Sequence, residues 1–161
     1  MIPFLSIIIV LFVVVFTYRV KKTSADQEEV LEKFSERERL ANATRRKDIS
    51  NLDYITIPEE FLLPDMTSES SHRILALRGK KMLNLSDMTN TDLKLQYGMQ
   101  NLEELSEYDD NFSELLRYLP EYTEELVEKG HRDIAVAILQ FAVDNGSDSK
   151  RVKASLDMLM G

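Results

Sequence analysis

The side chains able to do acid–base, nucleophilic or metal chemistry are few in this chain, and their spacing forms no catalytic pattern. Cysteine is absent, and His72 and His131 are the only histidines. The sequence lacks a Gly-rich phosphate loop, a His-Glu zinc motif and a nucleophile elbow, which would place reactive groups at fixed spacings. The sequence therefore predicts a protein that is not an enzyme and that uses no cofactor.

Acidic side chains cluster between Glu103 and Glu128. Asp109-Asp110 and Glu124-Glu125 are adjacent pairs, but neither has the ligand pattern of a calcium loop, so we expect no metal site. The formal net charge of -8 argues against nucleic acid as the main partner. Most of these carboxylates are expected on solvated helix faces. Three could instead form a rim for a basic protein partner, and these candidate partner-binding residues are Glu121, Glu124 and Glu128.

The first segment of the chain is an uncharged run from Ile2 to Tyr18, and basic residues follow it directly. About 17 apolar residues rising 1.5 Å each span roughly 26 Å, the short end of what crosses a bilayer. We therefore expect a transmembrane anchor over residues 1–22. A cleaved signal peptide is the alternative, but signal peptides carry positive charge before the apolar core. The predicted anchor residues are Ile2, Phe4, Leu5, Ile7, Ile8, Ile9, Leu11, Phe12, Phe16 and Tyr18.

Basic residues on one side of the run predict its orientation. Arg19, Lys21 and Lys22 flank its C-terminal end, where anionic lipid headgroups would also attract them. Lys and Arg favour the cytoplasmic side of a span. We therefore expect a single-pass protein of the cell membrane whose C-terminal domain is cytoplasmic.

The next two segments predict a spacer and a linker. Residues 23–49 are highly charged, with a thin apolar stripe that includes Val30, Leu31 and Phe34, and predict one juxtamembrane helix. This helix is either a solvated spacer or a weak site of parallel self-association. Residues 50–80 contain two prolines and a Ser-rich stretch, so we expect an extended, flexible linker there. Its apolar residues Tyr54, Ile55 and Ile57 either dock on the helical domain or form a peptide that binds another protein.

Residues 81–161 show the periodicity of a helical domain. Apolar residues recur every three or four positions on both sides of Gly130, and a third helix follows Asn145-Gly146. Pro120 should either kink the first of these helices or divide it in two. The fold class is therefore expected to be all-α. The residues expected at the helix packing interface are Leu119, Tyr122, Leu126, Ala135, Leu139 and Ala142.

The stretch from Leu119 to Asp148 resembles a tetratricopeptide unit, which consists of two antiparallel helices. The resemblance implies that small residues at Ala135 and Ala142 let the paired helices approach closely, with Leu139 filling the gap between them. The whole chain is also similar to short single-pass bacterial membrane-anchored proteins that carry no assigned function.

The tetratricopeptide resemblance covers one unit and is incomplete. Thr123 stands where the family usually has a small residue, and Ser147 where it has a proline. One hairpin cannot bury its apolar faces alone, since such arrays normally need about three units. Either residues 82–105 or a partner chain must therefore complete the core.

Two classes of function follow from these features. The first is a membrane-tethered interaction module, an adaptor or scaffold, that binds a protein or peptide in a groove beside residues 134–144, rimmed by the three glutamates. The alternative is a structural subunit of a membrane complex, whose helical domain is completed by a partner chain. The absence of a catalytic pattern favours both over an enzyme, and we expect the first.

Overall fold

All regular secondary structure in the described part of this computed structural model is helical. The backbone is described for residues 2–161, and side chains for the same residues except 2–10, 20, 21 and 23–26. The all-α part of the predicted fold class is thereby confirmed. In chain order the elements are α1 (Ile2–Ala43), η1 (Glu59–Phe61), α2 (Glu69–Leu75), α3 (Asn90–Tyr97), η2 (Met99–Asn101), α4 (Leu102–Glu128), α5 (Arg132–Asp144) and α6 (Lys150–Met160).

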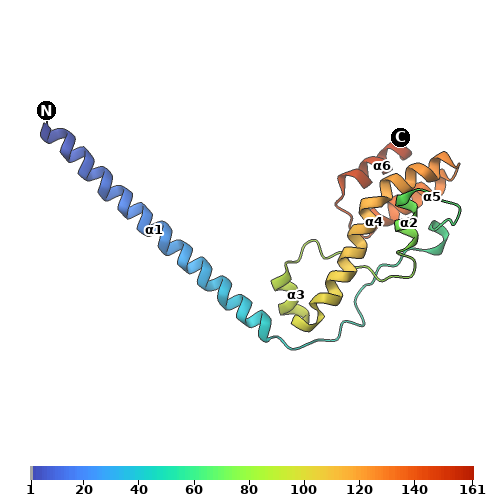
Figure 1. The fold of residues 1–161 in the computed structure, drawn as a ribbon, viewed down its shortest axis with the longest axis horizontal. Coiled ribbons are helices and arrows are strands. Elements are labelled where there is room, and N and C mark those ends of the chain that lie inside the picture. Colours follow the sequence, from blue (N-terminus) through green and yellow to red (C-terminus); the bar gives the residue numbers. More distant parts are fainter. Residues whose placement is uncertain (1) are drawn as a thin grey trace.

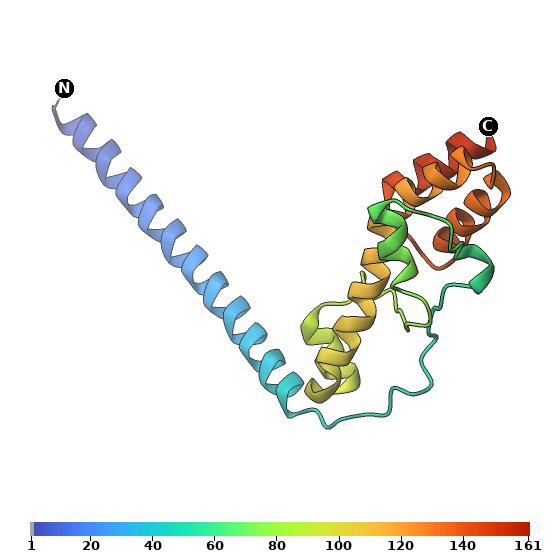
Figure 2. The same ribbon diagram turned by 45° about the vertical axis from the view of Figure 1, so that its right-hand side comes forward.

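One long helix, α1, projects from a helical body formed by the other elements (Figure 1). The view turned by 45° shows the same arrangement, with α1 meeting the body at its C-terminal end beside α3 (Figure 2). Two ion pairs form this junction: Arg37 with Asp92 at 2.5 Å, and Glu38 with Lys94 at 3.0 Å. Ala41 is fully buried. The body therefore holds α1 by one end only.

The predicted transmembrane anchor is wrong. Within the described residues, no helix combines the length and the apolar character that crossing a membrane requires. The uncharged run spans only about 26 Å, against a hydrocarbon core of roughly 30 Å. Beyond it, α1 continues as a charged helix to Ala43. The single-pass location and the cytoplasmic orientation inferred from Arg19, Lys21 and Lys22 depended on this span and are overturned with it.

The side chains assigned to that anchor fall into two groups. Those of Ile2, Phe4, Leu5, Ile7, Ile8 and Ile9, and that of Lys21 beside the run, lie outside the side chains that the structure describes. The rest are exposed: Leu11 by 59%, Phe12 by 68%, Phe16 by 58% and Tyr18 by 69%. Arg19 and Lys22 are exposed as well. This part of α1 therefore presents apolar side chains that the body does not cover.

The main hydrophobic core lies where α2, α5 and α6 pack against α4. Leu115 and Leu119 of α4, Ile138 of α5 and Val152 of α6 are all fully buried. Their three- and four-residue spacing places each on one face of its helix, as amphipathic packing requires. A smaller core between α3 and the start of α4 contains Leu93 and Leu105, with Ile49 and Leu83.

Residues 50–80 belong to the main core and do not form the flexible linker expected from the sequence. Ile57, Leu62, Met66 and Ile74 are each at most 4% exposed. The two prolines do keep this segment out of long helices, but its apolar residues still pack onto the body. The cover that α4 and α5 need therefore comes from this chain itself.

Backbone constraints define the helix boundaries around the core. Gly130 separates α4 from α5 with a φ of +87°, a conformation that only glycine adopts without strain. At Gly98 a Cβ atom would lie 2.6 Å from the carbonyl oxygen of Arg45, so any side chain would displace the segment that follows α1. Pro120 does not divide its helix, because α4 runs unbroken from Leu102 to Glu128.

Candidate functional site

The six residues predicted at the helix packing interface lie together in the main core. All six are fully buried, three on α4 and three on α5: Leu119, Tyr122, Leu126, Ala135, Leu139 and Ala142. Tyr122 also donates its hydroxyl to the carbonyl oxygen of Phe61 at 2.6 Å, and burial raises the pKa of this phenol. These contacts hold α4 in one orientation and so decide which of its side chains face outward.

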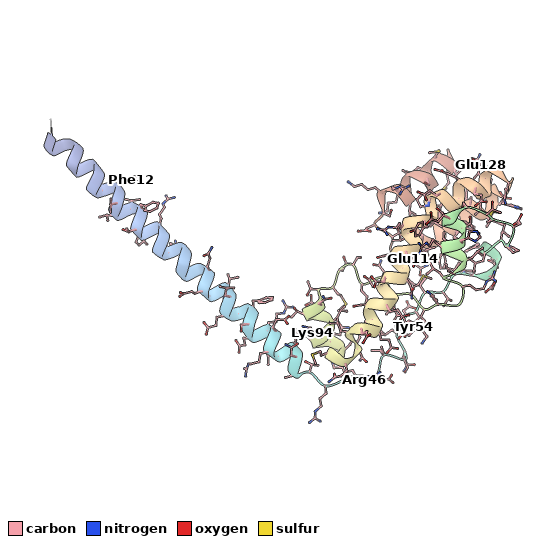
Figure 3. All side chains as sticks on the ribbon, viewed as in Figure 1. Phe12, Arg46, Tyr54, Lys94, Glu114 and Glu128 are labelled. Atoms are coloured by element: carbon pink, nitrogen blue, oxygen red, sulfur yellow. The ribbon has the colours of Figure 1, made fainter. Side chains whose placement is uncertain are left out.

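An apolar groove of about 300 Å³ lies between the C-terminal part of α4 and α6. Its apolar lining comes from Val127 of α4 and from Met158 and Leu159 of α6. Glu124, Glu128, Thr123 and Ser155 complete the lining. Glu128 lies at the end of the body away from α1 (Figure 3).

The two groove carboxylates have no partner among the described residues. Neither Glu124 nor Glu128 accepts a hydrogen bond or forms an ion pair there. Met158 is 76% exposed, so the apolar lining is open to solvent. An apolar surface with charged groups at its edge is the usual anatomy of a protein interface. The arrangement can therefore bind an apolar side chain and attract a cation next to it.

The third predicted rim residue, Glu121, is engaged within the body. It accepts a hydrogen bond from the hydroxyl of Ser70 at 2.5 Å and one from Arg151 at 3.3 Å. These two hydrogen bonds, with that of Ser70 the larger, lower the pKa of Glu121. The structure thus brings Glu124 and Glu128 to the groove and assigns Glu121 a structural contact between α2, α4 and α6.

Sequence reasoning missed the role of Glu125. Its carboxylate accepts hydrogen bonds from the backbone N–H of Thr67 at 2.8 Å, from that of Ser68 at 3.3 Å, and from the hydroxyl of Ser71. Burial acts to raise the pKa of Glu125, but these hydrogen bonds outweigh it and hold the pKa well below its ordinary value. Lys129 lies 3.5 Å away. Glu125 therefore fixes the start of α2 onto α4.

The groove lies beside α6, whereas the sequence placed it beside α5. α5 packs against α4, α6 and η1, and these contacts cover its apolar face. The buried side chains of α6 are Val152 and Leu156. Met158, on the open side of the same helix, carried no signal in the sequence, because a single exposed apolar residue is ordinary.

The two histidines lie apart and build no site. His72 is exposed on α2, and His131 is half-buried as the residue that precedes α5. Among the side chains that the structure describes, no three of His, Asp or Glu are grouped closely enough to hold a metal ion.

No protein-family model, curated protein or solved structure matches this chain. The tetratricopeptide resemblance therefore stays a prediction.

Proposed function

We propose that this protein is an interaction module, an adaptor or scaffold, that holds a basic amphipathic segment of a protein partner without catalysing a reaction. The observation that carries the proposal is a pair of carboxylates beside the apolar groove between α4 and α6, Glu124 and Glu128, which have no partner among the described residues. A partner that presents apolar anchors next to Lys or Arg satisfies both parts of the groove.

The shape of the groove suits a helical partner. Amphipathic helices bind in grooves through apolar anchors spaced at i, i+3 and i+4. A groove of about 300 Å³ is at the small end of binding pockets, so we expect few anchors. Met158 contributes a flexible, polarisable side chain that adapts to the shape of different anchors.

The two carboxylates should contribute to the association rate and to the orientation of the partner as well as to affinity. Two carboxylates at the edge of the groove steer a cationic segment toward it, and salt screens that steering. The desolvated part of the contact comes from Val127, Met158 and Leu159. Binding should therefore weaken as salt rises without disappearing.

The composition of the core supports a self-contained module over the alternative of a subunit completed by a partner chain. The segment before α3 covers α4 and α5 with buried side chains such as Leu62 and Ile74. All buried side-chain nitrogen and oxygen atoms among the described residues have hydrogen-bond partners. Such a body can present its groove before any partner arrives.

A synthetic helix of about 18 residues, with leucines on one face and lysines on the other, is a suitable probe. Fluorescence anisotropy with the full-length protein measures its affinity. The double substitution Glu124→Lys and Glu128→Lys should weaken binding about tenfold or more, that is by at least about 1.4 kcal/mol. The matched control is Glu103→Lys with Glu107→Lys, which makes the same charge change at the same spacing elsewhere on α4, and should bind like the unmodified protein.

Equal losses in the two double variants would contradict the proposal, because they would show a response to net charge and not to the groove. Equal affinity of all three proteins would do the same. Circular dichroism of each variant confirms that α4 remains folded.

A further inference from the structure

The exposed part of α1 carries the same chemistry that the groove between α4 and α6 is suited to bind. Phe12 and Phe16 are 68% and 58% exposed, and their ring centroids lie 6.0 Å apart. Arg19 and Lys22 follow within two turns and are exposed as well. At 100° per residue, Phe12, Phe16 and Arg19 share one face of the helix.

Leaving this segment uncovered in water is unfavourable. Removing apolar surface from water is favourable, and an exposed aromatic pair is typical of an interaction site. Among the described residues, the other helices that α1 contacts are α3 and η2, both near its C-terminal end. The body of the same chain therefore provides no cover for Phe12 and Phe16.

The groove and the aromatic pair of one chain cannot meet. Phe12 and Glu128 lie at opposite ends of the molecule (Figure 3). The ion pairs from Arg37 and Glu38 to α3 hold the C-terminal end of α1 at the start of α4. α4 then runs for 27 residues, about 40 Å, toward the groove. Folding α1 back would require breaking a continuous helix, so the segment must come from another molecule.

We propose that the groove of one molecule binds the Phe12–Lys22 segment of α1 of a second copy. The two aromatic rings occupy the apolar lining formed by Val127, Met158 and Leu159, and the cations of the segment face Glu124 and Glu128. The inference rests on the proposed function of the groove and names its partner. Charge complementarity and the exposed aromatic pair argue for this occupant over any other segment of the chain.

The geometry makes the assembly head-to-tail. Each molecule offers one α1 segment and one groove on different surfaces, so the interface is heterologous and each bound copy leaves a free segment and a free groove. The full-length protein should therefore form a concentration-dependent series of oligomers and not stop at a symmetric dimer.

Complementation between two full-length variants tests the proposal. The first, Phe12→Ser with Phe16→Ser, removes the aromatic anchors and keeps the groove. The second, Glu124→Lys with Glu128→Lys, disables the groove and keeps the anchors. Neither pair of substitutions touches the core, since all four side chains are exposed. Sedimentation velocity measures the mass of each variant alone and of the equimolar mixture.

We expect the unmodified protein to form oligomers, each variant alone to be monomeric at the same concentration, and the mixture to form a complex of two chains and nothing larger. The control with Glu103→Lys and Glu107→Lys should assemble like the unmodified protein. A monomeric unmodified protein, or a mixture that stays monomeric, would overturn the proposal. Persistent oligomers of the second variant would overturn it too, because α1 helices would then be associating with one another.

The peptide measurement separates this inference from the proposed function. If the unmodified protein binds the leucine–lysine helix at the groove but shows no assembly, the groove is a docking site and its partner is not α1. If the peptide does not bind either, both proposals fail. If assembly occurs as described, unlabelled peptide in excess should dissociate the oligomers.

Discussion

Two neighbouring surfaces of the C-terminal half of α4 carry the same residue type in different surroundings. Glu121 and Glu125 accept hydrogen bonds from the Ser-rich start of α2 and so join two parts of the body. Glu124 and Glu128 meet no partner among the described residues and line an open groove. The difference shows that the contacts of each glutamate depend on which residues the fold brings near it. They do not follow from its charge or from its neighbours in the sequence.

The largest expected effect comes from disturbing the core that orients both surfaces. Leu139→Ala should leave a cavity between α4 and α5 and lower the free energy of unfolding by about 2–5 kcal/mol. Ala135→Leu should overpack the same contact and cost about 1–3 kcal/mol. Urea unfolding followed by circular dichroism measures both. If neither substitution changes the free energy of unfolding, the packing of α4 against α5 does not hold the two surfaces in place.

The next effect distinguishes the surfaces directly. Glu125→Gln keeps the size of the side chain but weakens its hydrogen bonds to Thr67, Ser68 and Ser71. Hydrogen bonds to charged groups contribute about 1.5–3 kcal/mol, so the free energy of unfolding should fall by about that amount. Matched unfolding curves of Glu124→Gln serve as the control. A stable Glu125→Gln variant would mean that α2 does not need this carboxylate.

The pH dependence of stability sharpens the same contrast. The pKa of Glu125 is lower in the folded protein than its ordinary value of 4.5, so its contribution is present above that pH and is lost as the pH falls below it. Stability measured between about pH 6 and pH 3 should therefore decline less steeply in Glu125→Gln than in the unmodified protein. Glu121 shares this acid sensitivity through Ser70. Parallel pH profiles for both proteins would contradict the structural role of Glu125.

The smallest expected effect on stability is at the groove. Glu124→Gln with Glu128→Gln should change the free energy of unfolding by less than about 0.5 kcal/mol, as for surface residues without partners. Thermal and urea unfolding both report on this. A larger loss would show that these carboxylates stabilise the body in a way that the structure does not reveal.

The sequence was sufficient for the parts of the fold that depend on local periodicity. Leu119, Leu126 and Leu139 recur at helical spacing, and their burial follows from that spacing alone. The turn at Gly130 was equally visible, because glycine at the end of an apolar repeat marks a helix end. The close pairing of α4 and α5 could therefore be predicted residue by residue.

The contacts that assign roles to the glutamates could not be predicted in the same way. Thr67 and Ser71 meet Glu125 across more than fifty positions of sequence, and no local pattern encodes such a pairing. The apolar run at the N-terminus misled for a related reason. Composition alone does not distinguish a membrane span from an apolar run of about 26 Å at the start of a longer, charged helix.

The most direct test of the groove as a docking site is the affinity of the leucine–lysine helix for two neutralised variants. Glu124→Gln with Glu128→Gln and Glu103→Gln with Glu107→Gln each remove two charges from α4. We predict that the first pair weakens binding about tenfold, or about 1.4 kcal/mol, while the second leaves the affinity unchanged. Equal affinities of the two variants would contradict the assignment of the groove as the docking site.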